Sequence, residues 1–303
     1  MKKEEIKEVL KLHKLWIETN GSEGERAYLK NVNLVDCDLQ YANLKKAILI
    51  DCNLAYCILY SADLSYANLI DCKLTYASLK KANLSYANLA YCNLYSADLS
   101  HSNLKKANLK NADLLNAYLK DANLLDCKLT GADLSDCNLR NADLSYANLA
   151  YCKLTHANLK KANLINANLA YCNFSNAILI DCNLLNADLS YANLAYCNLL
   201  NADLSYANLK NADLFNAYLM DADLFNAYLM DADLTYCNLR NANLINANLS
   251  DCNLRYADLI NANLMYADLS YANLYYAKLH SANLTYSNLL ETKMDDADLS
   301  YDK

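Results

Sequence analysis

Nearly the whole chain obeys a strict five-residue period. From Ala27 onward a large apolar residue stands at every fifth position, and 53 of the 55 central positions between Leu29 and Leu299 are Leu. The two exceptions, Phe174 and Met294, are also apolar. No insertion or deletion interrupts the period. The chain is therefore a repeat protein, in which each repeat contacts mainly its neighbours.

A period of five fits neither common regular element. A helix repeats every 3.6 residues and a strand every two, so either would scatter the Leu side chains over all faces. A short extended segment followed by a tight turn instead keeps each Leu directed inward, with a small residue two positions before it. Asn or Asp precedes most central residues, and such side chains form turns by bonding to nearby backbone. We expect stacked coils about 4.8 Å apart.

Runs such as SYANLAYCNL and NADLSYANLK resemble the pentapeptide-repeat family, whose motif is A(D/N)LXX. The resemblance covers about nine tenths of the chain. It implies an all-β solenoid, a right-handed quadrilateral β-helix with four pentads per coil. The 55 pentads then form about fourteen coils with a combined length of roughly 65 Å.

Residues 1–20 follow a different pattern. Acidic residues occupy the first turns, Asn20-Gly21 supplies a stop, and apolar side chains recur at helical spacing together with His13: Ile6, Val9, Leu10, Trp16 and Ile17. We expect one amphipathic helix that caps the first coil, followed by the β-helix over residues 21–303. A membrane-surface or partner helix is the alternative. The stretch from His13 to GERAYL resembles a leader that precedes pentapeptide repeats in some bacterial proteins.

Residues twenty positions apart should stack, and this register predicts a partner surface. Apolar residues that directly follow a central residue form two neighbouring columns: Ile165, Leu185, Phe225, Ile245 and Met265 in one, and Ile180, Leu200, Met220 and Ile260 in the other. The equivalent N-terminal positions are polar or basic, as at Lys45 and Lys80. A patch of this extent indicates a protein partner or self-association. The alternative is that neighbours within a column merely shield one another.

Charge also divides the chain. Residues 27–161 carry 15 basic and 12 acidic residues, whereas residues 162–303 carry 6 and 16. The densest acidic band consists of Asp203, Asp213, Asp221, Asp223, Asp231 and Asp233. Such polarity repels nucleic acid and favours a basic protein surface. The alternative is simple solvation of the repeat surface.

All 13 cysteines occupy the small inward position. We interpret them as substitutes for Ala, because a buried thiol behaves as a small apolar group. Vertical pairs such as Cys37 and Cys57 would lie within disulfide range. So many unpaired thiols nevertheless indicate a reducing compartment, and with neither a signal peptide nor a membrane span in the sequence we expect the cytoplasm.

Tyrosines stand mostly at one position, with 19 of 26 placed second after a central residue. Columns such as Tyr151, Tyr171 and Tyr191 indicate stacked ladders, with a ring-lined surface for a sugar or nucleic acid as the alternative. The four histidines have no triad or metal-ligand spacing, and no glycine-rich phosphate loop is present. We therefore predict no enzyme, no cofactor and no metal site.

These features predict a non-catalytic scaffold or protein-binding module that presents C-terminal apolar and acidic faces to a protein. The family resemblance implies an alternative, because some members mimic B-form DNA and bind DNA gyrase or topoisomerase IV. A net charge of −7 is modest for such a mimic. Several members dimerise through C-terminal coils, so a homodimer through that end or through the apolar columns is also expected. Acidic residues crowd that end: Glu291, Asp295, Asp296, Asp298 and Asp302.

Overall fold

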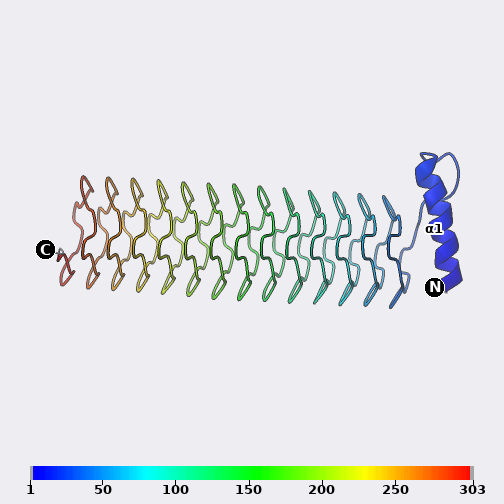
Figure 1. The fold of residues 1–303 in the computed structure, drawn as a ribbon, viewed down its shortest axis with the longest axis horizontal. Coiled ribbons are helices and arrows are strands. Elements are labelled where there is room, and N and C mark those ends of the chain that lie inside the picture. Colours follow the sequence, from blue (N-terminus) through cyan, green and yellow to red (C-terminus); the bar gives the residue numbers. More distant parts are fainter. Residues whose placement is uncertain (1–2, 301–303) are drawn as a thin grey trace. The chain divides into compact units, whose positions relative to one another are not determined.

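The computed structural model describes residues 3–300 and resolves the chain into two compact units, Met1–Asn148 (unit 1) and Leu149–Lys303 (unit 2). Within the described residues there is one helix, α1, which spans Lys3–Glu18 and belongs to unit 1. The β-structure of both units consists of isolated single-residue bridges rather than continuous strands. Each unit is thus a stack of short extended segments joined by turns (Figure 1).

Backbone pairing follows one rule in both units. Parallel bridges run from Tyr28↔Ile48 to Lys128↔Asn148 in unit 1, and from Lys153↔Asn173 to Lys278↔Asp298 in unit 2. Every bridge joins residues twenty positions apart. Because a pentad contains five residues, one turn of the solenoid contains four pentads. The predicted β-solenoid is confirmed.

The turns have the chemistry that the sequence predicted. The Asn43 side-chain oxygen accepts a hydrogen bond of 3.2 Å from the backbone N–H of Lys45, two residues on. The Leu44 carbonyl then accepts a 2.9 Å bond from the N–H of Ala47, which closes the turn. Lys46, within that turn, has a φ of 61°, and non-glycine residues at this position of the other pentads up to residue 300 lie between 52° and 63°. Positive φ is uncommon outside glycine, so the lattice imposes it.

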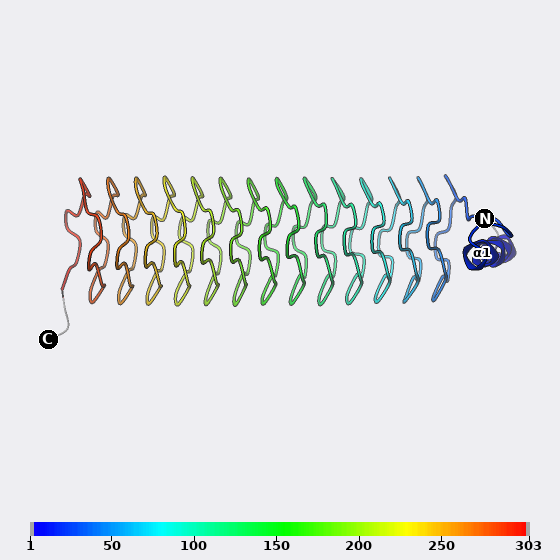
Figure 2. The ribbon, with the colours of Figure 1, turned by 90° about the horizontal axis from the view of Figure 1, so that it is seen from above.

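The core is a column of large and small side chains along the middle of each unit. No central residue from Leu29 to Leu279 is more than 2% exposed. The backbone N–H of Leu164 donates a 2.7 Å bond to the carbonyl of Asn183, and the same bond recurs at nearly every pentad. Figure 2 shows the regular stacking that results. Each unit is held by burial of apolar side chains together with a continuous backbone ladder.

Helix α1 lies across the start of the coil stack in unit 1 (Figures 1 and 2). Ile6 and His13 are buried, whereas Val9, Leu10, Trp16 and Ile17 are half-buried. The backbone N–H of Ala27 donates a 3.0 Å bond to Nδ1 of His13. The N–H of Glu25 donates a 3.1 Å bond to the carbonyl of Leu12. The helix therefore contacts the first repeat through both apolar side chains and hydrogen bonds.

The C-terminal end of unit 2 has no covering element among the described residues. Leu289 and Leu299 are 39% and 44% exposed, although central leucines deeper in the unit are buried, and Leu290 at the adjoining turn is 55% exposed. The acidic residues predicted at this end are exposed where described, and Asp302 lies outside the described residues. An uncovered edge of this kind leaves backbone groups and apolar side chains open to water.

Candidate functional site

The nine predicted partner residues border one side of unit 2. That side consists of the pentads that begin at Ala162 and recur every twenty residues to Ala262. One apolar column stands at the turn that precedes these pentads and the other at the turn that follows them. Ser205 and Arg240 interrupt the columns. The structure thus brings the nine residues to the two edges of a single face, which we call the apolar-edged face.

Their exposure is smaller than the pattern suggested. All nine side chains are half-buried. Phe225 contacts the ring of Tyr206 edge to face, with ring centroids 5.6 Å apart. Part of the Phe225 ring is therefore covered by a tyrosine that stands beside the column. The face offers two apolar ridges rather than one continuous exposed patch.

The middle of this face is polar. Asp203 is bridged to Asp223, and the Asn243 side-chain N–H donates a 2.9 Å bond to Oδ1 of Asp223. Oδ1 of Asp223 also accepts the backbone N–H of Phe225 at 3.0 Å. One carboxylate oxygen of each such Asp is therefore committed to the turn, while the charge remains available to a partner.

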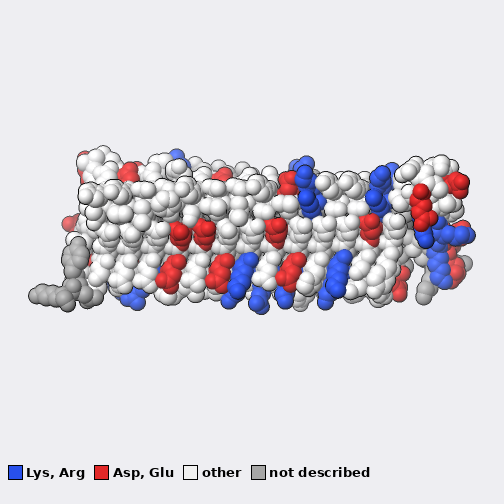
Figure 3. Space-filling model, turned by 45° about the horizontal axis from the view of Figure 1, so that its top comes forward, with Lys and Arg blue, Asp and Glu red and all other residues white. Residues whose placement is uncertain are grey.

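The acidic band does not form one patch. Asp203 and Asp223 are bridged to each other, and Asp213 and Asp233 form a second bridged pair half a turn away. Asp221 and Asp231 are likewise half a turn apart, and both are exposed at turns. Half a turn leads to the opposite side of the solenoid. The six carboxylates therefore lie in two groups on opposite sides, and only Asp203, Asp221 and Asp223 adjoin the apolar-edged face. Charged side chains also occur as separate small groups on the surface shown in Figure 3.

Tyrosine provides most of the exposed aromatic surface. Tyr151, Tyr171 and Tyr191 stack with centroids 4.9 Å apart at each step and interplanar angles of 6° and 1°. The predicted ladders are confirmed. Because each ring in the middle of a ladder is covered on both faces, the ladders present ring edges and hydroxyl groups to solvent. This arrangement leaves little free ring face for stacking a sugar or base.

The cysteines are free, and 12 of the 13 are buried. Many of the thiols donate a hydrogen bond to a Leu carbonyl in the neighbouring turn, and the sequence did not predict these bonds. The Cys127 Sγ lies 2.7 Å from the Leu104 carbonyl oxygen, and the Cys182 Sγ lies 2.8 Å from that of Leu159. Burial raises the pKa of both thiols to about 12. Thiolates, the nucleophilic form, are therefore scarce at these sites.

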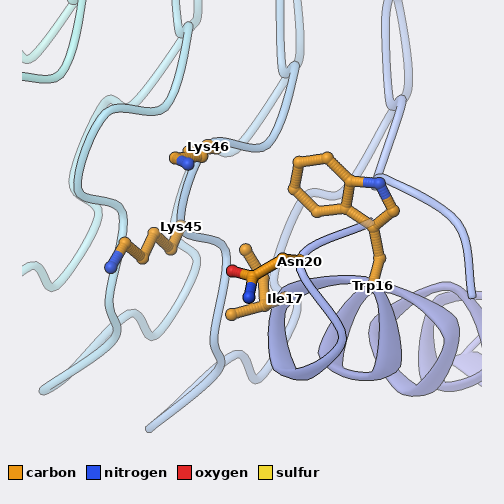
Figure 4. Close-up of a pocket in the computed structure, with 5 residues that line it drawn as sticks. All are labelled: Trp16, Ile17, Asn20, Lys45 and Lys46. Carbon is orange, nitrogen blue, oxygen red and sulfur yellow. The ribbon is translucent and has the colours of Figure 1, made fainter. Parts of the chain in front are cut away.

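Helix α1 and the first coils enclose a small pocket of about 260 Å³, lined by Trp16, Ile17, Asn20, Lys45 and Lys46 (Figure 4). The Arg26 guanidinium lies 5.8 Å from the Trp16 ring centroid, and its Nε donates a 2.6 Å bond to the Lys46 carbonyl. These contacts join the end of the helix to the first coils.

His13 is the residue of this region that the sequence interpretation undervalued. It is fully buried, its ring stacks against Trp16 at 5.7 Å, and its Nε2 has no hydrogen-bond partner among residues 3–300. Burial lowers the pKa of His13, the Lys45 backbone opposes that shift, and the charge of Arg26 reinforces it. The signal was present in the sequence, because His13 shares the helical spacing of the apolar residues.

The described part of the chain has neither a cluster of metal ligands nor a helix that could span a membrane. No three His, Cys, Asp or Glu side chains among residues 3–300 are grouped to hold a metal ion. The one helix described there is too short and too polar to cross a membrane.

Comparison with protein families gives a consistent result. A family model of pentapeptide repeats matches the chain in eight copies, over residues 27–65, 62–100, 92–131, 122–160, 157–194, 182–221, 227–264 and 262–300. A comparison with curated proteins finds no match.

Among solved structures, the chain is similar to HetL, a pentapeptide repeat protein involved in heterocyst differentiation regulation from the cyanobacterium Nostoc sp. strain PCC 7120. The two are 30% identical over 85% of this chain and 89% of HetL, with a TM-score of 0.21. Rfr23 from the cyanobacterium Cyanothece 51142 is 39% identical over 33% of this chain and 64% of its own, with a TM-score of 0.26. QnrB1, a plasmid-mediated fluoroquinolone resistance protein, is 16% identical over 74% and 87%, with a TM-score of 0.26. At such TM-scores the superpositions carry no functional argument.

Proposed function

Because the chain belongs to the pentapeptide-repeat family, we propose that it is a non-catalytic protein-binding module that engages its partner through the apolar-edged face of unit 2. One observation carries the proposal. Nine apolar side chains line both edges of this face, whereas the positions of unit 1 in the same register hold residues such as Lys80, Lys105 and Arg140. The lattice itself does not require apolar residues at these turns, so their concentration in unit 2 needs another explanation.

The face suits a protein partner in two respects. Its backbone groups are paired in the bridge ladder, so it is rigid and loses little conformational entropy on binding. Its edges supply Phe and Met, residue types that are enriched at interfaces, and its middle supplies the carboxylates of Asp203 and Asp223. We therefore expect a partner surface with two apolar ridges and a basic strip between them.

Partner capture from bacterial lysate tests this proposal. The wild-type protein is compared with a Phe225→Asp, Ile245→Asp variant, which places charge at two of the five apolar sites of one ridge. The matched control is a Ser85→Asp, Thr285→Asp variant, which adds the same charge at the same turn position outside the face. We expect the control to retain the captured protein and the ridge variant to lose it. Equal capture by both folded variants would refute the proposal.

The acidic character of unit 2 supports a second candidate. Unit 2 carries 16 acidic and 9 basic residues, whereas unit 1 carries 18 of each. A DNA mimic that binds DNA gyrase or topoisomerase IV would need such an excess of negative charge. A gyrase supercoiling assay tests this candidate: inhibition or protection of gyrase supports it, and the absence of any effect removes it.

We also propose the handedness and coil number of the solenoid, its compartment and its mode of self-association. We propose a right-handed course with about fourteen coils, with residues 1–20 as the cap and residues 21–303 as the β-helix, as the family suggests. The buried contacts of α1 support its role as a cap. The free thiols support a reducing compartment, the cytoplasm. The uncovered apolar edge at Leu289 and Leu299 supports a homodimer through the C-terminal coils.

A further inference from the structure

Unit 2 contains a perfect tandem duplication of ten residues. The sequence FNAYLMDADL occupies residues 215–224 and is repeated at residues 225–234. Together the copies make one complete turn of the solenoid, because bridged residues are twenty positions apart. This turn holds two of the three Phe residues of the chain and two of its five Met residues. We call it the duplicated coil.

The duplication produces two similar surfaces on opposite sides. Each copy makes half a turn, so a residue in the second copy lies across the solenoid from its counterpart in the first. Phe215, Tyr218 and Met220 cross one side as a row. The second row crosses the opposite side and consists of Phe225, Tyr228 and Met230.

The two rows depart from the ordinary surface of the lattice. Most pentads have Asn or Asp in the bridged position, where the duplicated coil has Tyr218 and Tyr228. Tyr228 is 56% exposed, and it lines a largely apolar hollow of about 360 Å³ with Met230 and Lys210. In the other row, the Tyr218 hydroxyl lies 3.2 Å from the Met220 sulfur. Aromatic and thioether groups thus replace a polar ladder on both sides.

Charge within the segment that contains the rows has one sign, and the cations Lys210 and Arg240 stand at its two ends. Residues 211–239 contain no Lys or Arg, and they carry five carboxylates: Asp213, Asp221, Asp223, Asp231 and Asp233. None of the five forms an ion pair within the described part of the chain. The uncompensated charge beside an apolar row favours a segment that combines apolar side chains with Lys or Arg.

We infer that the duplicated coil is a bivalent docking site, which binds two copies of a basic, apolar protein segment, one on each side. The two rows go beyond the apolar-edged face and share with it only Met220 and Phe225, which stand at turns, whereas Asp221 and Asp223 adjoin both surfaces. The two sides are not identical in their surroundings. Arg240 beside Met220 is neutralised by Asp258 at 3.0 Å, whereas Lys210 beside Met230 makes no ion pair in the described residues. The Tyr228 side therefore binds a basic segment more weakly.

Titration calorimetry of the full chain with a defined peptide tests the inference. The probe is a fourteen-residue amphipathic peptide of Leu and Lys only, and its counterpart of Leu and Glu serves as the negative control. We expect two Leu/Lys peptides per wild-type chain and no binding of the Leu/Glu peptide. Tyr218→Asn and Tyr228→Asn restore the usual residue of the lattice, so each variant should fold. Each alone should leave one peptide per chain, and the double variant should bind none.

Two controls make the result specific. Tyr118→Asn alters the same bridged position in unit 1, where Tyr118 is 55% exposed, and should leave two peptides per chain. Ile245→Asp alters the apolar-edged face but neither row, so it should also leave two, even if it abolishes partner capture. Failure of the proposed function and failure of this inference are therefore distinguishable. A single site, a stoichiometry insensitive to the Tyr substitutions, or no saturable binding would overturn the inference.

Discussion

Units 1 and 2 share one backbone plan and differ mainly in the side chains that the plan leaves free. In both, the central Leu residues are buried, the bridges are parallel and the turns are closed by the same hydrogen bonds. Unit 1 has equal numbers of acidic and basic residues, and lysines occupy many of its turns. Unit 2 has an acidic excess, two apolar ridges and the duplicated coil. The comparison teaches that stability and recognition use separate positions of each pentad, so that one can vary without the other.

The ends of the units provide a second contrast. The first coil of unit 1 is covered by α1, with His13 buried between them, whereas the last coil of unit 2 exposes Leu289, Leu290 and Leu299. An end that is covered needs no partner, and an end that is open can pair with another edge.

The largest effect is expected in the shared core. Leu64→Ala in unit 1 and Leu164→Ala in unit 2 each remove a fully buried side chain and should lower the free energy of unfolding by about 2–5 kcal/mol. The cost should be similar in both units, because the surroundings are equivalent. Chemical denaturation followed by circular dichroism measures the loss, and hydrogen exchange localises it. Phe174→Leu, which restores the common residue, is the control and should change stability far less. A large difference between the units would break the comparison.

Acid should loosen the covered end and leave the rest of unit 1 folded. Nδ1 of His13 accepts the Ala27 N–H, and a protonated ring could not accept it. The pKa of His13 is lowered in the folded state, so only the unfolded state binds this proton between the ordinary value near 6.5 and the lower folded value. Stability of the cap should therefore fall as pH decreases through that window. Hydrogen exchange of α1 against pH checks this, with His13→Gln expected to flatten the profile. Unchanged exchange in the wild type would remove His13 from this role.

A smaller effect is expected from the tyrosine ladders. Tyr171→Ala in unit 2 removes two stacking contacts at 4.9 Å and should cost about 0.5–1.5 kcal/mol per ring pair beyond the loss of buried area. Tyr146→Ala in unit 1 is the matched control, because Tyr146 occupies the same turn position and is 59% exposed. Denaturation midpoints compare the two. Equal losses would show that stacking adds nothing to stability at Tyr171.

The smallest effect is expected from a buried thiol. Cys182→Ala removes the 2.8 Å bond to the Leu159 carbonyl and should cost about 1 kcal/mol or less, because that carbonyl also accepts a backbone N–H. Alkylation kinetics supply a second measurement. Since the pKa of the Cys127 and Cys182 thiols is raised to about 12, both should react only as fast as their units open. Rapid alkylation of the folded protein would contradict the buried assignment.

Much of the fold could be predicted because its rules are local. The five-residue period assigned Leu164 and Cys182 inward and Tyr171 outward, and the structure confirms all three. The Asn and Asp turns were equally predictable, because each side chain bonds to backbone only two residues away. The candidate site was harder to predict from the sequence than the fold. The sequence placed Phe225 in an apolar column but could not show that Tyr206 partly covers it.

The sequence by itself therefore determined the period and the direction of each side chain, and the family resemblance added that residues twenty positions apart stack. Tertiary structure alone decided how far each side chain is exposed and that Cys127 bonds to the Leu104 carbonyl. It also decided that His13 joins α1 to Ala27. The physical reason is distance along the chain. Local backbone geometry sets the direction of a side chain, whereas its exposure and partners depend on neighbouring turns and on the spatial arrangement of the helix.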